Sequence, residues 1–320
     1  MSIDVLSPGL LTTVQDLGRF GWRHLGVGTS GALDAYAHTL ANMLVGNPAN
    51  AATLEITLTG PRLTFQHPCT IALCGAQIDA HCDGQIIPCA RPVQLPAGST
   101  LTLGACRTGA RTYLAVAGGI DVPECMHSRS TDLRGGFGGL AGRALRAGDH
   151  IPLRPSSLLD LTAPCIAPWW IDDALDAAHS APIHLLPSVD ALASPGTLLA
   201  TRWNISAQSN RQGLRLQGPA LQLVNNDERI SAPVAPGTVQ LPPDGQPIVL
   251  LADAQTHGGY PCIGHVIRAD RQRLAQLRPG DTFHFAAVTP QQARQAWQAQ
   301  QHMLARLQLA IHARREAMTC

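Results

Sequence analysis

The chain has 320 residues, which is enough for one large domain or for two of ordinary size. Its 23 basic and 22 acidic residues leave a formal net charge of +1 without any basic block, so the composition gives no support to nucleic-acid binding. Every basic residue is an arginine. A Walker A loop, Schiff-base chemistry and covalently attached biotin or lipoyl all need a lysine. The absence of lysine therefore excludes all of them for this chain.

Cysteine usage and the N-terminal sequence favour a soluble cytoplasmic protein with reduced thiols. The nine cysteines form no CxxC pair, the first residues lack the features of a signal peptide, and no apolar run approaches the ~20 residues of a membrane helix. The cysteines and histidines between residues 67 and 89 match no zinc spacing. We expect no metal site there, and we expect these cysteines to fill gaps in strands.

Thirty glycines and 24 prolines, together with short apolar runs closed by Gly, Pro or Asp, predict a mainly β fold. A first helix is expected over residues 34–45, with Gly46 as its end. Predicted strand regions follow at 52–60, 63–85, 99–105, 111–119 and 282–288.

The C-terminal residues predict a long helix over 290–316, because Thr289 and Gln292 fit a capping box and Pro290 suits the first turn. The helix carries an apolar stripe that we expect to pack on the protein's own β structure. The stripe consists of Ala293, Ala296, Trp297, Met303, Leu304, Leu307 and Ile311.

One turn pattern occurs three times, as LPAGSTL from Leu95, LRAGDHI from Leu145 and LRPGDTF from Leu277. Each copy is a glycine turn that leads into a strand, which suggests two β domains of related architecture, although a common turn used three times explains it nearly as well. The predicted boundaries are residues 1–154 for the first domain, 155–182 for a linker or covering segment, 183–289 for the second domain and 290–320 for the helix.

Four stretches combine polar side chains with glycines and are the candidates for chemistry: 12–34, 128–143, 209–218 and 239–261. Glycines let a backbone approach a ligand closely. The loop 128–143 has Ala141 where a dinucleotide fingerprint needs its third glycine, so a dinucleotide site is not predicted there. Two interpretations stay open for this loop: a cradle of backbone amides that binds an anion near Arg129, Arg134 or Arg143, or a surface loop. There is no G-x-S-x-G elbow for a serine hydrolase.

Carboxylates at the ends of apolar strands are costly to bury without a partner, which makes Asp16, Asp34, Asp253 and Glu55 candidates for catalysis. The alternative is that they form ion pairs with arginines and tie loops to the β structure. His24 and His257 are weaker candidates for a general base.

These stretches together resemble one family. TTVQDLGRFGWRHLGV, LANMLVGNPANAATLEITLTGPRL, YLAVAGGIDVP, STDLRGGFGGL, SNRQG, PGTVQLPPDGQPIVLLADAQTHGGYP and LRPGD occur in the family's order across about residues 5–290. The family is that of the C subunit of the bacterial ATP-dependent 5-oxoprolinase, also called the biotin-dependent carboxyltransferase or allophanate hydrolase subunit 2 family.

The resemblance implies two cyclophilin-like β-barrel domains, a complex with a B-subunit homologue and, as a further partner, an A-subunit homologue. The three proteins would open 5-oxoproline to L-glutamate with ATP hydrolysis, with Mg²⁺ expected beside the ATP. Related sequences move a carboxyl group from a partner's biotin to urea, so carboxyl transfer to a urea-like acceptor is a second expectation. A third is a non-catalytic binding or regulatory role within the complex. No membrane or nucleic-acid partner is expected.

The resemblance also directs the choice of site residues. Asp16, Asp34 and Asp253 are predicted to orient or activate a water molecule. Donors and anion-binding groups for the substrate are predicted in both halves of the chain. They are Gln15, Arg19, Ser30, Arg211, Gln255, Thr256, Gly258, Gly259 and Tyr260. The chain departs from the usual family pattern at Gln212, Leu214 and Cys262, and these departures leave the substrate open.

Overall fold

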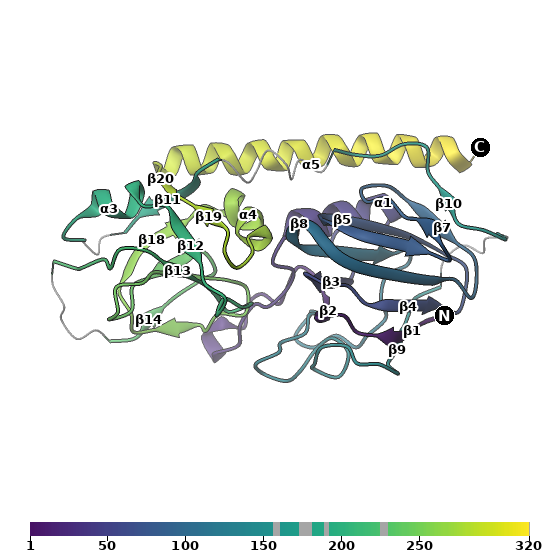
Figure 1. Ribbon diagram of the computed structural model, residues 1–320, viewed down its shortest axis with the longest axis horizontal. Helices are drawn as coiled ribbons and strands as arrows, with labels where there is room; N and C mark the ends of the chain where they lie inside the picture. Colours follow the sequence, from purple (N-terminus) through teal and green to yellow (C-terminus); the bar gives the residue numbers. More distant parts are fainter. Residues whose placement is uncertain (156–160, 173–180, 189–191, 225–229, 320) are drawn as a thin grey trace. The chain divides into compact units, whose positions relative to one another are not determined.

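A computed structural model describes residues 1–155, 161–172, 181–188, 192–224 and 230–319 (Figure 1). The predicted linker, 155–182, lies partly outside these residues. The chain divides into two compact units. The first unit comprises Met1–Arg19, Ser30–Leu175 and Leu304–Cys320, and the second comprises Phe20–Thr29 and Asp176–Met303.

The first unit is built on a ten-stranded sheet in which β10-β7-β5-β8-β4-β1-β9 form the main path, while β2 and β3 extend it from β8 and β6 pairs with β5. The strands are β1 (Ser2–Ser7), β2 (Leu11–Gln15), β3 (Thr53–Thr57), β4 (Arg62–Phe65), β5 (Cys69–Cys82), β6 (Gln85–Ile86), β7 (Val93–Leu95), β8 (Thr100–Val116), β9 (His150–Pro152) and β10 (Cys165–Ile166). A 3₁₀ turn, η1 (Arg23–Leu25), interrupts the loop after β2 and is grouped with the second unit.

The centre of this sheet is the antiparallel pair of β5 and β8, in which Cys74 lies opposite Tyr113. The register shifts next to Gly75, which has a φ of +105°. A Cβ at this position would collide with the carbonyl oxygen of Arg111, so only glycine fits the bulge.

Helix α1 (Ala35–Val45) covers part of the sheet, and its buried face packs against β5 and β8 through Leu40 and Leu44. Asp34 caps its N-terminus by accepting a hydrogen bond from the amide of Ala37 at 2.9 Å. Gly46 ends the helix with a φ of +77°. The predicted helix and its end at Gly46 are confirmed, and the structure adds Asp34 as its N-cap.

Cysteines act as apolar fillers in the first unit. Cys69, Cys74, Cys82 and Cys106 are buried in its core clusters. The pKa of the Cys69 thiol is raised to about 12, mainly by burial and to a smaller extent by the nearby Cys82. The Cys69 thiol is therefore protonated at neutral pH.

The second unit contains an eight-stranded sheet with the order β19-β12-β13-β16-β15-β18-β11-β20. All its pairs are antiparallel except β11 with β20. The strands are β11 (Ile183–Pro187), β12 (Trp203–Ile205), β13 (Gly213–Gln217), β15 (Thr238–Gln240), β16 (Ile248–Leu250), β18 (Cys262–Val266), β19 (Thr282–Phe283) and β20 (Phe285–Ala287). β14 (Ala232–Pro233) and β17 (His257–Gly258) form a separate pair.

This second sheet curls on itself. The first and last strands of its path, β19 and β20, are separated in sequence by His284 alone. The two ends of the path must therefore meet, which closes most of a barrel. Short helices α3 (Pro195–Ala200) and α4 (Arg271–Gln276) and the 3₁₀ turn η2 (Arg268–Asp270) also belong to this unit.

The repeated glycine turns are built alike. Gly98, Gly148 and Gly280 all have positive φ values and precede β8, β9 and β19. In the second and third copies the aspartate after the glycine accepts a hydrogen bond from the backbone amide three residues earlier. Asp149 accepts from Arg146 and Asp281 accepts from Arg278, each at 2.7 Å.

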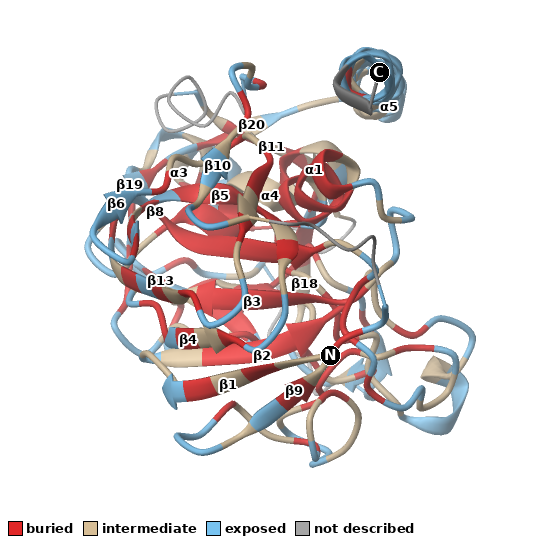
Figure 2. Ribbon diagram, turned by 90° about the vertical axis from the view of Figure 1, so that its right-hand side faces the viewer, coloured by how far each residue is buried: buried red, intermediate tan, exposed pale blue. Residues whose placement is uncertain are grey.

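The chain ends in helix α5 (Pro290–Thr319), whose first turn has the predicted capping box between Thr289 and Gln292. Ile311 is 2% exposed and belongs to the core cluster around α1, whereas Leu309 is 72% exposed. Figure 2 shows the contrast between the buried strands β3 and β5 and the largely exposed helix. The mainly β fold with few helices and a long C-terminal helix is confirmed. No helix in the described part of the chain could span a bilayer.

Candidate functional site

The predicted site residues divide between the two units, so each group is described within its own unit. In the first unit the loop after β2 meets the loop 128–132, more than 110 residues later in the sequence. Asp16 is the centre of this meeting. Its carboxylate accepts hydrogen bonds from the Ser128 hydroxyl at 2.7 Å, the Ser130 hydroxyl at 2.5 Å, the Arg129 amide at 2.6 Å and the Gly18 amide at 2.8 Å. Four donors on one buried carboxylate hold the two loops together.

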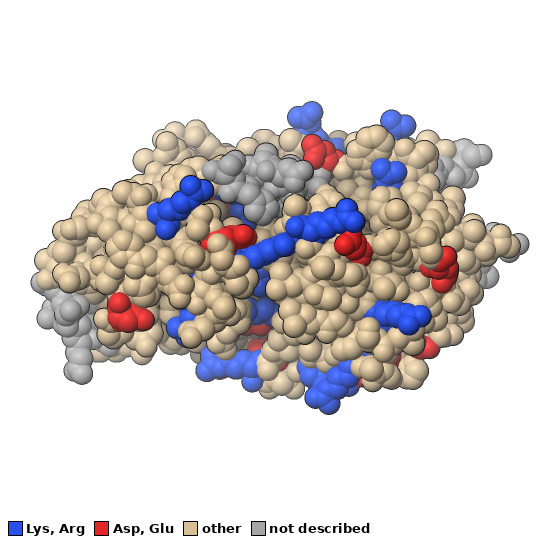
Figure 3. Space-filling view, viewed as in Figure 1, with Lys and Arg blue, Asp and Glu red and all other residues tan. Residues whose placement is uncertain are grey.

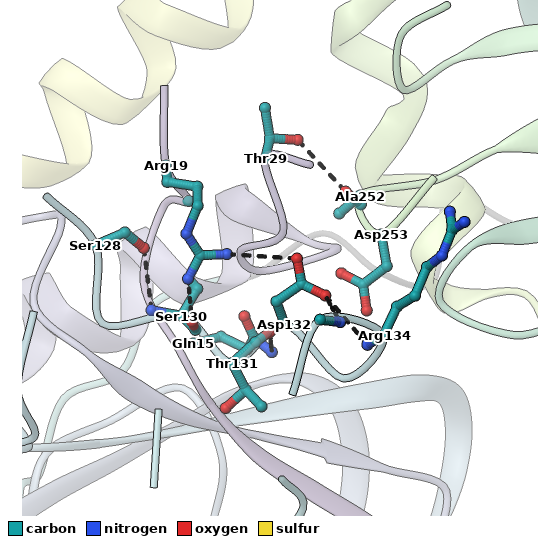
Figure 4. Close-up of polar contacts among 12 residues, drawn as sticks. Gln15, Arg19, Thr29, Ser128, Ser130, Thr131, Asp132, Arg134, Ala252 and Asp253 are labelled. Carbon is teal, nitrogen blue, oxygen red and sulfur yellow. Dashed lines mark hydrogen bonds and ion pairs between the residues drawn. The ribbon is translucent and has the colours of Figure 1, made fainter. Parts of the chain in front are cut away.

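Arg19 lies beside this junction and is 1% exposed (Figure 4). Its guanidinium donates to the carbonyl of Ser130, lies 4.0 Å from a carboxylate oxygen of Asp132 and covers the ring of Phe137 at 4.7 Å. Gly138 has a φ of +70°, and a Cβ there would collide with the Ser130 carbonyl and approach the guanidinium. The glycine-rich loop therefore serves close packing around Arg19.

Two predicted site residues of this unit each carry a buried polar atom that has no hydrogen-bond partner among the described residues: the side-chain oxygen of Gln15 and the hydroxyl of Ser30. The orientation of the Gln15 amide is fixed, because its nitrogen donates to the carbonyl of Thr131 at 3.2 Å and to the Thr13 hydroxyl at 3.0 Å. Ser30 has a φ of +49°, a strained conformation for a residue with a Cβ. Each unsatisfied buried atom is a position at which a polar partner can complete the hydrogen bonding.

Asp34 and Glu55 belong to a buried network next to α1. Tyr113 donates to Glu55 at 2.7 Å and accepts from the amide of Asp34 at 2.8 Å, while Leu33 donates its amide to Glu55 at 2.9 Å. Burial, followed by the charge of Glu55, raises the pKa of Tyr113 well above its ordinary value. The phenol is therefore neutral and able to donate. Asp34 is at the same time the cap of α1, so the bonds of both carboxylates organise the fold around the site.

In the second unit Arg211 and Asp253 form a buried pair with two contacts, Nε to Oδ2 at 2.8 Å and Nη2 to Oδ1 at 3.0 Å. Both side chains are less than 5% exposed. The backbone amide of Asp253 also donates to the carbonyl of Arg211 at 3.1 Å. The guanidinium fork predicted to hold a substrate anion thus binds this carboxylate within the unit.

The predicted donors of residues 255–260 gather around Gln240 of β15. Gln240 accepts from Gln255 at 3.4 Å and donates to the carbonyl of Tyr260 at 3.3 Å. Gly258 packs against the Gln240 amide so closely that a Cβ would be 2.5 Å from its nitrogen. The hydroxyl of Thr256 lies 3.0 Å from Nδ1 of His257. Gly259 and Tyr260 are exposed.

The segment Phe20–Thr29 is grouped with the second unit although it follows β2 in the sequence. Arg23 donates to the carbonyl of Val234, and the Thr29 hydroxyl lies 3.4 Å from the carbonyl of Ala252 (Figure 4). Gly28 lies against the carbonyl of Ala254. A Cβ at Gly28 would lie 3.5 Å from this carbonyl, which is an ordinary contact, and Gly21 and Gly26 have no neighbour within 4 Å of such a Cβ.

The anion cradle considered for the loop 128–143 has little free charge. Arg129 pairs with Glu124 at 2.6 Å, and Arg143 pairs with Asp149 at 2.8 Å. Charged side chains are sparse on the face drawn in Figure 3 and form no single-signed patch. In the described part of the chain no three His, Cys, Asp or Glu side chains are placed to hold a metal ion.

Sequence reasoning missed three polar contributors: Ser128, Ser130 and Gln240. The serines bind a carboxylate more than 110 residues away, which no local pattern reveals. For Gln240 a signal existed, since Thr238 and Gln240 alternate with Val239 as polar residues on one face of a strand. Of the departures from the family pattern, Leu214 is a core residue that is 2% exposed, and Gln212 is exposed.

Comparisons with known proteins show which sequences and structures the chain is similar to. The C subunit of 5-oxoprolinase from Escherichia coli (strain K12) is 41% identical over 310 residues, which cover 97% of this chain and 99% of that protein. The urea amidolyase of Saccharomyces cerevisiae is 32% identical over 323 residues, which cover 93% of this chain and 17% of that protein.

Among solved structures, the urea amidolyase of K. lactis matches with a TM-score of 0.86 and 32% identity, covering 95% of this chain and 20% of that chain. The protein TTHA0988 matches with a TM-score of 0.77 and 36% identity, covering 89% of this chain and 55% of that chain. The family model described as carboxyltransferase domain, subdomain A and B, matches residues 25–287. The chain belongs to this carboxyltransferase domain family.

Proposed function

We propose that this chain is the C subunit of a 5-oxoprolinase complex, which opens the lactam ring of 5-oxoproline to L-glutamate with ATP hydrolysis in the cytoplasm. The observation that carries the proposal is the extent of the match. The chain covers 99% and 93% of two relatives named as C subunits of 5-oxoprolinase, but 17% of the yeast urea amidolyase. The A and B subunits follow as partners from the same proposal.

The unsatisfied atoms of Gln15 and Ser30 support an amide as ligand. A lactam presents one N–H donor and one carbonyl acceptor. The Gln15 oxygen can accept from that N–H, and the Ser30 hydroxyl can donate to the carbonyl, where negative charge develops when water attacks. We assign substrate contact to Gln15 and Ser30 in the first unit. The donors of the second unit, half-buried Gln255 and exposed Gly259 and Tyr260, stay predictions.

The catalytic role of the three aspartates stays a prediction. Their contacts within the fold support a positioning role. Asp16 has four donors, Asp34 caps α1, and Asp253 is bound by Arg211. A carboxylate held in this way uses its oxygens to fix the position of the groups that bind it. We therefore propose that these aspartates position loops and helices.

The two long helices offer no free N-terminus for a triphosphate, because the first turns of α1 and α5 are capped by Asp34 and by the Thr289–Gln292 box. We therefore derive no step through ATP or Mg²⁺ on this chain, and we propose that the nucleotide binds to a partner in the complex. The absence of lysine likewise leaves any biotin on another chain.

The test is glutamate release from 5-oxoproline by this chain mixed with the A and B subunits of the same organism, with each component and ATP omitted in turn. We expect glutamate only when all three chains and ATP are present. Release without this chain would give it a regulatory role. No release from a folded, assembled complex would contradict the proposal.

Three variants test the residue roles in that assay. Ser30→Gly keeps the positive φ and removes the hydroxyl, and Gln15→Met removes the acceptor, so each is expected to lower kcat/KM about tenfold or more. Asp34→Asn can still cap α1, so it should keep activity within about threefold. A loss above about a hundredfold in Asp34→Asn would instead indicate proton transfer.

A second candidate is carboxyl transfer from biotin on a partner to a urea-like acceptor. The observation that favours it is the TM-score of 0.86 with the K. lactis urea amidolyase. The same Gln15 and Ser30 atoms would complement the N–H and C=O groups of a urea. Transfer of labelled carboxyl from a carboxybiotin carrier to urea, in the absence of glutamate release, would support this alternative.

A further inference from the structure

A bulge in the second sheet brings a cysteine and a histidine to one face. Residues three apart in a regular strand point to opposite faces. In β18, however, Cys262 lies opposite Gln240 and Gly264 lies opposite Val239, so the strand contains one extra residue. His265 lies opposite Thr238, and Thr238 and Gln240 share a face. Cys262 and His265 therefore share it as well.

The side chains on this face contact one another in a row. The sulfur of Cys262 lies 3.4 Å from Nε2 of His265, and Nδ1 of His265 lies 3.3 Å from the Thr238 hydroxyl. When Nδ1 donates its proton to Thr238, the lone pair of Nε2 faces the thiol. The thiol also lies 3.5 Å from the carbonyl of Gly264. Cys262 is half-buried and His265 is exposed, so small reagents can reach the pair.

A positively charged side chain lies close enough to His265 to affect it. Arg271 packs over Gly237, the neighbour of Thr238, and its Nε is buried without a hydrogen-bond partner. No carboxylate of the described chain forms an ion pair with Arg271. The pKa of Arg271 is lowered to about 10, mainly by burial and to a smaller extent by the charge of Arg268. The pKa of His265 is also lowered, mainly by burial and to a smaller extent by the charge of Arg271. His265 is therefore neutral at pH 7, and Arg271 favours a negative charge nearby.

We propose that Cys262 is a nucleophilic thiol that forms mixed disulfides with anionic small-molecule disulfides, with His265 as proton acceptor and Arg271 as the group that binds the negative charge of the reagent. The thiol proton moves to Nε2, and the thiolate attacks one sulfur of the disulfide. A new S–S bond forms at Cys262, the old S–S bond breaks, and the leaving thiolate takes the proton from the imidazolium. The disulfide is the oxidant, and one S–S bond replaces another. This modification does not depend on the proposed function.

Other thiols of the chain provide internal references. Cys165 is exposed and marks the rate of an ordinary accessible thiol. Cys69 and Cys82 are buried, and burial is the main cause that raises the pKa of both thiols, to about 12 and about 11. Their lack of reaction reports that a variant is folded.

The experiment treats the full chain at pH 7 with dianionic 5,5′-dithiobis(2-nitrobenzoate) and, separately, with dicationic cystamine, and measures each cysteine by peptide mass spectrometry. We expect the anionic reagent to modify Cys262 about tenfold faster than Cys165, because Cys262 has a proton acceptor beside it and a cation near it. The variant His265→Gln should slow Cys262 with both reagents and leave Cys165 unchanged.

The ratio of the rates at which the anionic and the cationic reagent modify Cys262 distinguishes a binding role of Arg271 from a structural role. Arg271→Gln should lower the ratio of anionic to cationic rates at Cys262 about 25-fold, because one charge near 4 Å in water changes each rate about fivefold and in opposite directions. Arg202→Gln, which removes an exposed arginine of the same unit, should leave the ratio unchanged. A Cys262 rate no higher than that of Cys165, or a ratio insensitive to Arg271→Gln in a folded variant, would overturn the proposal.

Discussion

His38 shows how a single buried group makes stability depend on pH. It is 0% exposed, with Nδ1 2.9 Å from the Thr53 hydroxyl and Nε2 3.2 Å from the Asn42 side-chain nitrogen. Burial lowers its pKa to about 4, although the charges of Asp16 and Glu55 act in the opposite direction. The folded protein therefore holds this imidazole neutral at pH values where the unfolded chain protonates it.

The sign of the pH effect follows from linkage. The unfolded pKa is about 6.5, so the contribution of His38 is complete above that pH and is lost as the pH falls toward 4. The loss is roughly 3 kcal/mol of unfolding free energy over this range. Urea unfolding between pH 7 and pH 4 should show a shallower pH dependence for His38→Gln than for the natural chain.

The matched control for this prediction is His67→Gln, because His67 is exposed. Its unfolding free energy should follow the natural chain at every pH. An identical pH dependence in His38→Gln and the natural chain would mean that another group titrates in this range and that the imidazole of His38 is not held neutral by burial.

Residue types can be predicted from the sequence more readily than residue partners. The sequence identifies Asp16 as a carboxylate that needs partners, but it points to arginines, and the structure supplies the hydroxyls of Ser128 and Ser130 instead. Hydroxyl and amide donors are everywhere in a sequence, so they cannot be assigned until loops distant in the chain have been brought together.

At the scale of elements, the Arg211–Asp253 pair joins the segment before β13 to the segment after β16. Because both groups are buried, the loss of one partner leaves a charge without compensation. We expect Asp253→Asn to lower the unfolding free energy by about 3–5 kcal/mol. The double variant Arg211→Met with Asp253→Leu should recover most of that loss, since apolar groups of similar volume replace a buried pair well.

Urea unfolding of the single and double variants measures this coupling as a double-mutant cycle. An exposed pair offers the comparison: Arg154 and Asp121 lie 3.2 Å apart with about half of each side chain exposed. Asp121→Asn should cost about 0–1 kcal/mol. A similarly small loss in Asp253→Asn would show that the Arg211–Asp253 pair does not hold the two segments together.

Elements with local signals are predictable, and irregular ones are not. The caps at Asp34 and Thr289 lie within three residues of the helices they begin, so the sequence shows them directly. The bulge in β18 depends on pairing with β15, about 25 residues earlier. A regular alternation predicts that Cys262 and His265 point apart, and only the register between the two strands brings them together.

At the scale of the whole molecule, the division into units does not follow the order of the chain. Phe20–Thr29 is grouped with the second unit, and α5 contributes residues up to Met303 to the second unit and residues from Leu304 to the first. The boundaries predicted from the sequence, at 154 and 183, follow changes in composition. Composition carries no information on a segment that leaves one unit and packs on another, because such a segment keeps the polar and glycine content of any loop.

The two parts of α5 should therefore stabilise different units. Ile311 is buried with α1 in the first unit, and Trp297 covers the guanidinium of Arg268 at 4.1 Å in the second. Ile311→Ala should cost about 2–4 kcal/mol and raise hydrogen exchange in α1 and β5. Trp297→Ala should raise exchange in η2 and α4 at a cost of about 1 kcal/mol or more.

Hydrogen exchange followed by mass spectrometry resolves these segments in one experiment. Leu309→Ala is the matched control for Ile311→Ala, since Leu309 lies two residues away and is 72% exposed, and its exchange should equal that of the natural chain. If Ile311→Ala instead raised exchange equally in β13 and β16 of the second unit, the two units would unfold together, and the helix would stabilise the whole molecule through a single cooperative transition.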